Sequence, residues 1–185
     1  MDRHKRNRWK GFISGALGGV TGVLAMRYYR QLATAVIGHD PRQVSKQGDN
    51  DASTALDSIS LIGTHHKASE SSTAAVGRIA FQPVTGHEPQ QETKTTLSYI
   101  VHWIISLFAR SVYGALRGDT HWPDVTGGLA LAVGLWSLGD ELAIPLLGLA
   151  SDPTASPLEL HAHAPGAHLA YGLAAGTQTL DQLFE

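Results

Sequence analysis

The residues best suited to chemistry are ionisable side chains that lie inside otherwise apolar stretches. Asp140 and Glu141 interrupt one such stretch, and His102 and His168 lie within two others. An ionisable group inside a membrane is costly and normally points into a helix bundle or a wet cavity. A carboxylate can orient an imidazole and stabilise its cation. The three residues His102, Glu141 and His168 could therefore relay protons, or bind a metal ion with one position open.

The depth of these three residues predicts that they meet. In an up-and-down bundle, a rise of about 1.5 Å per residue places His102, Glu141 and His168 roughly 8, 13 and 10 Å from one face. Each also lies on a stripe of small residues. Two alternatives remain open. The trio could be a polar clip that only holds helices together. The third span could also end near Leu138, with both acids in headgroup water and Pro145 breaking the helix.

Other polar residues are weaker candidates for the same site. His161 and His163 form a His-x-His pair at the outer edge of the last apolar stretch, a spacing that metal sites use. The complete set of secondary candidates is Asp140, His161, His163, Tyr113 and Tyr171. The sequence contains no phosphate-binding loop, dinucleotide fingerprint, HExxH or Gly-x-Ser-x-Gly motif. No catalytic residue, cofactor or metal is therefore assigned, and the chain is more typical of a non-enzyme.

Four apolar stretches must position these residues. They cover residues 11–26, 97–115, 125–150 and 161–183, and the first three are the more apolar. Each approaches the length that a helix needs to cross a bilayer. No segment shows the strict alternation of a half-buried strand. The pattern predicts an all-α polytopic membrane protein with about four transmembrane helices in a small bundle, plus a polar linker with short amphipathic helices.

Small residues at helical spacing predict how the bundle packs. Gly11, Gly15, Gly18 and Gly22 follow steps of four and three residues, which lets helix backbones approach closely in a membrane. The same stretch also fits a secretory signal peptide, with Val23–Ala25 as a cleavage site.

Composition divides the chain into three regions. Residues 1–37 hold a basic N-terminus and the first span, residues 38–96 form a polar linker, and residues 97–185 form a three-helix transmembrane region. Within the linker, apolar residues such as Ala52 and Ile59 recur at helical spacing. That spacing predicts one or two surface helices, although plain disorder also fits the composition.

Charge is distributed unevenly along the 185 residues, which contain no cysteine and carry a formal net charge of −2. All 14 Lys and Arg lie in residues 1–117, and none lies in residues 118–185. Cytoplasmic loops of membrane proteins are enriched in Lys and Arg. The basic N-terminus, together with Arg110 and Arg117 in the short loop after the second span, predicts that both termini are cytoplasmic. The linker and the Asp152–Glu159 loop would then lie outside.

The C-terminal region resembles a known family. The resemblance covers roughly residues 97–176 and rests on diffuse motifs: His102, Tyr113-Gly114, Gly127, Asp140-Glu141, Pro145, Gly148-Leu149, Pro153, Pro157, His161, His168 and Tyr171-Gly172. In this pattern the chain resembles the YagU-like small bacterial inner-membrane proteins, a domain of unknown function. The resemblance implies a bacterial inner membrane and transfers no activity.

Two classes of function follow from these observations. The first is a membrane bundle whose polar interior handles protons, a metal ion or a small solute. The second is a scaffold or accessory subunit that binds other proteins through its glycine-striped helices and polar linker. The expected partners are the lipid bilayer and either a second copy of the chain or another membrane protein. Nucleic acid is not expected, because the chain is not strongly basic.

Overall fold

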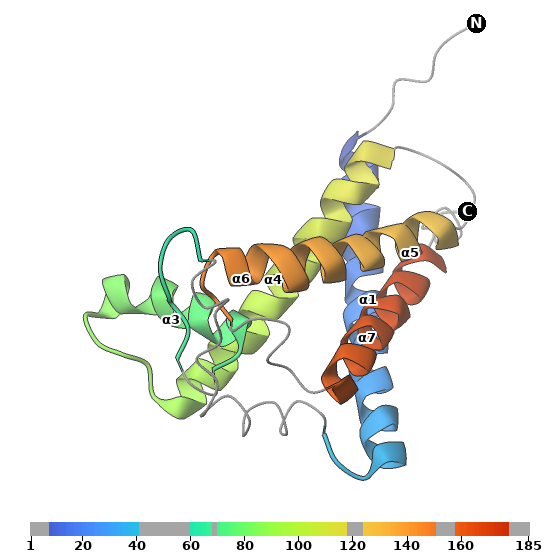
Figure 1. The fold of residues 1–185 in the computed structure, drawn as a ribbon. Coiled ribbons are helices and arrows are strands. Elements are labelled where there is room, and N and C mark those ends of the chain that lie inside the picture. The colour runs from blue at the N-terminus through green and yellow to red at the C-terminus, as the bar shows by residue number, and fades with distance from the viewer. Residues whose placement is uncertain (1–7, 41–59, 68–69, 118–123, 151–157, 178–185) are drawn as a thin grey trace, which may run out of the picture. The chain divides into compact units, whose positions relative to one another are not determined.

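A computed structural model describes residues 8–40, 60–67, 70–117, 124–150 and 158–177, and this part of the chain is entirely helical apart from turns and connections (Figure 1). The helices are α1 (Arg8–Ile37), α3 (Ser72–Thr85), α4 (Gln91–Arg117), α5 (Val125–Gly134), η2 (Leu135–Ala143), α6 (Ile144–Leu146) and α7 (Leu158–Thr177). The predicted all-α class is confirmed for these residues. The surface helix expected around Ala52, and most of the Asp152–Glu159 loop, lie outside them.

Two helices are long and apolar enough to cross a membrane. One is α4, with 27 residues, and the other is the continuous helix Val125–Leu146, with 22 residues, which joins α5, η2 and α6. Neither α1 nor α7 meets the same criterion within the described residues. Glycine adds little hydropathy to α1, and histidines lower that of α7. Two of the four expected spans are therefore supported by length and composition, and the other two stay predictions.

The helix of the third predicted span does not end near Leu138. The helix continues through both Asp140 and Glu141 as the π-helix η2, and then through Pro145 to Leu146. Pro145 lies one residue before the end of this continuous helix. The helix-breaking role assigned to Pro145 is therefore wrong.

The described helices divide into two compact units, each made of segments far apart in sequence. Unit 1 comprises Met1–Arg30, Trp103–Val133 and Gly166–Glu185, and unit 2 comprises Gln31–His102 and Gly134–Pro165. Each unit is described separately below.

Unit 1 is held together by glycines. Gly11, Gly15, Gly18 and Gly22 are all buried on one face of α1. A Cβ on Gly15 would lie 2.7 Å from the Cα of Ser111 on α4, and a Cβ on Gly22 would lie 2.5 Å from the ring of Tyr171 on α7. Contacts this short leave no room for a side chain, so α1 lies directly on the backbone of α4 and on the Tyr171 ring.

Unit 2 joins α3 to the beginning of α4 and to the end of the helix Val125–Leu146. The Ser71 side chain caps α3 by accepting from the Ala74 N–H at 3.3 Å. Gly77 of α3 packs against Leu97, and Thr73 and Ser98 form a hydroxyl hydrogen bond of 2.7 Å. Residues 60–67, called the 60–67 segment, bond to the far end of the other helix: Leu61 N–H donates to the Leu146 carbonyl at 2.9 Å.

Side chains are distributed in the reverse of the usual soluble pattern. The described buried residues are mainly small or polar, including Ala132, Ser106 and Ser111. Large apolar side chains are exposed along α1, α4, the helix Val125–Leu146 and α7, as at Phe108 and Leu138. Exposed apolar surface on this scale marks contact with a protein or a membrane.

Candidate functional site

Glu141 lies on the π-helix η2, within a helix that could cross a membrane. The indole N–H of Trp136 donates to its carboxylate at 3.0 Å. The hydrogen bond joins residues five apart, as expected where the backbone bonds also run between residues five apart. The α-helical period instead predicts Asp140 on the face of Trp136. Asp140 is exposed, and Glu141 is the acid that accepts from the indole N–H of Trp136.

The two histidines of the predicted trio lie in different units. His102 is half-buried on α4 in unit 2, which also contains Glu141, and His168 is half-buried on α7 in unit 1. Their convergence with Glu141 stays a prediction. Among the described residues, no group of three or more His, Asp or Glu side chains could hold a metal ion. The metal-binding form of the hypothesis thus has no support in this part of the chain.

The secondary candidates have separate surroundings. Tyr171 is buried, and its hydroxyl donates to the Ser106 carbonyl at 2.7 Å, so it joins α7 to α4. Tyr113 donates to the Asp124 carboxylate. His163 is buried on α7. His161 belongs to the first turns of α7, where only the backbone is described.

Arg110 is a buried polar residue whose position differs from the sequence prediction. It was assigned to a cytoplasmic loop, but it lies inside α4 with only 5% of its surface exposed. Its Nη2 donates to the Ala175 carbonyl at 2.8 Å, and its guanidinium lies 4.8 Å from the centre of the Tyr113 ring. Ala175 belongs to the last turn of α7, where carbonyls lack helical partners. Arg110 therefore caps α7 and contributes nothing to the loop charge that orients the chain.

Successive steps of four residues along α4, in place of steps of four and three, would have identified Arg110 from the sequence. The stripe of small residues on which the prediction places His102 continues through Ser106, Ala109 and Tyr113. The buried residues of α4 are instead Ser106, Arg110, Ser111 and Gly114. Steps of four from Ser106 lead to Arg110 and Gly114, so the helical period itself contains the signal.

Asp124 organises the beginning of α5. Its carboxylate accepts from the Gly127 N–H at 2.7 Å and from the Tyr113 hydroxyl, and it pairs with Arg117 at 3.0 Å. Burial by itself raises the pKa of Asp124. The hydrogen bonds from Tyr113 and Gly127 and the charge of Arg117 outweigh burial, so the pKa of Asp124 is lowered. Asp124 is thus a charged N-cap that holds α4 and α5 together within unit 1.

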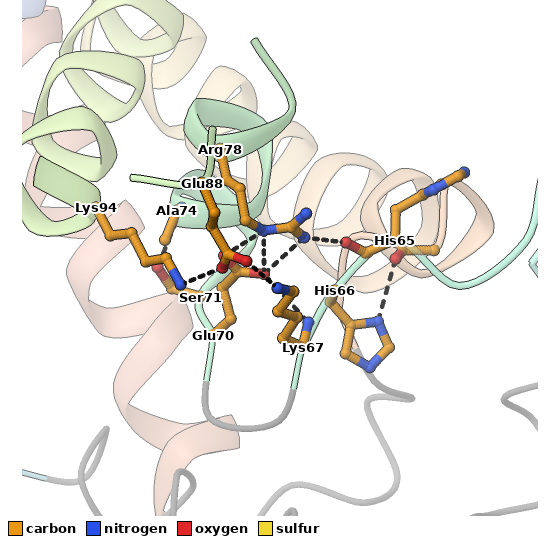
Figure 2. A network of polar contacts seen from close by, with 10 residues as sticks. His65, His66, Lys67, Glu70, Ser71, Ala74, Arg78, Glu88 and Lys94 are labelled. Atoms are coloured by element: carbon orange, nitrogen blue, oxygen red, sulfur yellow. Dashed lines mark hydrogen bonds and ion pairs between the residues drawn. The ribbon is translucent and has the colours of Figure 1, made fainter. Parts of the chain in front are cut away.

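A second polar network lies in unit 2 and fixes the 60–67 segment against α3 (Figure 2). Arg78 and Glu70 form a buried ion pair at 2.9 Å, and Arg78 also donates to the His65 carbonyl. The hydrogen bond to Glu70 is the main cause that raises the pKa of Arg78. Arg78 thus stays charged across the physiological range.

Glu88 accepts from two lysines in the exposed part of the same network. Lys67 Nζ and Lys94 Nζ each lie 2.6 Å from a Glu88 oxygen. The hydrogen bond from Lys67, followed by that from Lys94, lowers the pKa of Glu88 from 4.5 to about 2. The network is structural in character, because each charged group has a partner within the unit.

This arrangement predicts how acid acts on unit 2. A carboxylate whose pKa falls on folding adds stability above its unfolded pKa. That stability is lost as the pH falls towards the folded pKa. We therefore expect the 60–67 segment to exchange its amide hydrogens faster, relative to the intrinsic rate, as the pH falls from 4.5 to about 2. The Glu88→Gln variant should lose this dependence, and high salt should weaken it because the pairs are exposed. An unchanged pH dependence in Glu88→Gln would contradict the assignment.

No protein-family model, curated protein or solved structure matches the chain. The resemblance to YagU-like proteins accordingly stays a prediction.

Proposed function

We propose that this chain is a multi-pass integral membrane protein that handles protons at Glu141. We place it in a bacterial inner membrane with both termini in the cytoplasm, as the charge pattern and the YagU-like resemblance imply. The reversed distribution of side chains supports membrane residence. Helices that pack through Gly and Ser while exposing large apolar residues suit lipid, which supplies no hydrophobic drive for burial.

One observation carries the proton-handling role: a partly buried carboxylate accepts an indole N–H on a π-helix inside a candidate span. An ionisable residue in a membrane segment is by default a functional-site hypothesis, and π-helical segments occur frequently at functional sites. Glu141 lies five residues before Leu146, so it is roughly 8 Å from the end of the helix. A carboxyl group at that depth could exchange protons with the adjacent aqueous phase.

The glycine contacts favour this proposal over a scaffold. The scaffold alternative uses the glycine stripe to bind other proteins, but Gly11, Gly15, Gly18 and Gly22 are buried against this chain's own helices. A partner would have to bind elsewhere. The glycine stripe therefore serves the internal packing of unit 1, and we assign the function to the polar residues instead.

The variant Glu141→Gln tests the role of the carboxylate. Its amide oxygen can still accept from Trp136, so the helix should fold normally while the titratable group is lost. Vesicles containing the wild-type protein should dissipate an imposed pH gradient, as read by an internal pH dye, and Glu141→Gln should lose this flux. The matched control, Asp140→Asn, changes the neighbouring exposed acid and should retain it. Equal flux in wild type and Glu141→Gln, or no flux above protein-free vesicles, would overturn the proposal.

A further inference from the structure

Unit 2 links the beginning of one candidate span to the end of the other. On one side, α3 contacts Leu97 and Ser98 near the beginning of α4. On the other, Leu61 N–H donates to the Leu146 carbonyl at 2.9 Å, and His65 N–H donates to the Gly148 carbonyl at 2.8 Å. The two linking elements are themselves joined, since Arg78 of α3 donates to the His65 carbonyl (Figure 2). If both helices cross the bilayer, these ends therefore lie at the same membrane face.

The backbone hydrogen bonds also fix the position of the 60–67 segment relative to the end of the helix Val125–Leu146. The Leu146 carbonyl ends the helix Val125–Leu146, where helical partners run out, and Gly148 lies two residues beyond it in a turn. The N–H groups of Leu61 and His65 supply the missing donors. The segment therefore lies where the span leaves the hydrocarbon region.

The side chains at this level are apolar and uncovered. Leu61 is 78% exposed and Ile62 is 58% exposed, and Leu147 beside them is also exposed. Exposure of three neighbouring aliphatic side chains to water would be energetically unfavourable. The same segment ends in the exposed Lys67, and cationic side chains beside apolar ones are favoured at the headgroup boundary.

From these contacts we propose that Leu61, Ile62 and Leu147 form a lipid-binding patch, inserted at the headgroup–acyl boundary of the membrane that the two helices span. The inference rests on the proposed membrane residence and adds a surface element to it. The 60–67 segment then acts as an interfacial anchor, and α3 and the Arg78–Glu70 pair hold it in place. The occupant of the patch is lipid, and a protein partner is one alternative outcome of the test below.

Single cysteines test the anchor directly, because the chain has no native cysteine. An environment-sensitive fluorophore would be attached to Leu61→Cys in reconstituted vesicles. Lipids carrying a nitroxide quencher either near the headgroup or near the end of the acyl chain then report its depth. We expect a blue shift in emission and stronger quenching by the shallow nitroxide. The matched control is Gln91→Cys, an exposed position about 9 Å outward from Leu97 along α4, which should show neither effect.

A third position separates the failure of this inference from the failure of the function proposed above. Phe108 is exposed on α4, about 16 Å along the helix from Leu97, so a label on Phe108→Cys should be quenched by the deep nitroxide if α4 spans the membrane. Quenching at Phe108 without quenching at Leu61 would overturn the anchor alone. A protein partner covering Leu61 would give this same result, because the label's emission would shift to the blue without quenching by the lipid nitroxides. No quenching at Phe108 would overturn membrane residence and the anchor with it.

Discussion

Replacing Gly15 by alanine is expected to destabilise the helix bundle of unit 1 by about 3 kcal/mol, at the upper end of the usual cost of overpacking. The added Cβ would lie 2.7 Å from the Cα of Ser111 and would also meet the Arg110 carbonyl. Both obstacles are backbone atoms, so no side-chain rotation can relieve the contact. The helices α1 and α4 would have to move apart, which would disturb the other glycine contacts along the same face. The loss should appear as a lower thermal unfolding midpoint in detergent.

Gly134→Ala is the matched control for this prediction. Gly134 ends α5, and a Cβ placed there meets nothing within 4 Å. Alanine is a better helix former than glycine by roughly 1 kcal/mol, so this variant should be as stable as the wild type or slightly more so. Equal stability of Gly15→Ala and Gly134→Ala would show that the close approach of α1 to α4 is not the feature that stabilises unit 1.

Removing Glu70 should have the largest effect on unit 2. The Glu70→Ala variant leaves the buried guanidinium of Arg78 without its carboxylate partner, and breaking a buried ion pair typically costs about 3 kcal/mol or more. The protection of the amides in residues 60–67 and in α3 should fall by a similar amount, since Arg78 joins these two elements. Hydrogen exchange read by mass spectrometry would measure the change, which corresponds to a rate increase of roughly a hundredfold.

A paired substitution distinguishes the cost of an unpaired charge from the loss of the contact itself. The double variant Glu70→Leu with Arg78→Met removes both charges and keeps apolar volume, a change that is often neutral in protein interiors. The His65 carbonyl loses its donor, so a residual cost of about 1 kcal/mol is expected. If the double variant were as unstable as Glu70→Ala, the ion pair would have to contribute net stability beyond satisfying Arg78.

Periodicity accounts for much of what the sequence determined. The apolar stretches and the absence of strand alternation predict helices, and the described residues are helical. The spacing of small residues likewise selects a face of α1, because steps of three and four bring side chains to one side of an α-helix. The glycines on that face are the ones that contact α4 and α7. These properties are local, so they can be derived from neighbouring residues alone.

The tertiary structure decided which polar residues have partners. Arg110 was placed in a loop by its charge, yet its guanidinium caps α7, whose last turn is distant in sequence. The 60–67 segment was part of a polar linker, yet its N–H groups satisfy the end of α6. Both outcomes depend on unpaired carbonyls at helix ends, which must find donors wherever the chain supplies them. The helical period can place Arg110 on the buried face of α4. No local pattern identifies the distant carbonyl to which it donates.

The same distinction applies to Asp140 and Glu141 in the helix Val125–Leu146. The sequence singled out Asp140 and Glu141 as polar residues in an apolar stretch, and it did so from composition alone. The hydrogen bond from Trp136 to Glu141 joins residues five apart within a π-helical segment, a spacing that the α-helical period does not predict. Periodicity assumes one pitch throughout. Only the folded chain shows the π-helical segment, and with it the hydrogen bond from the indole to Glu141.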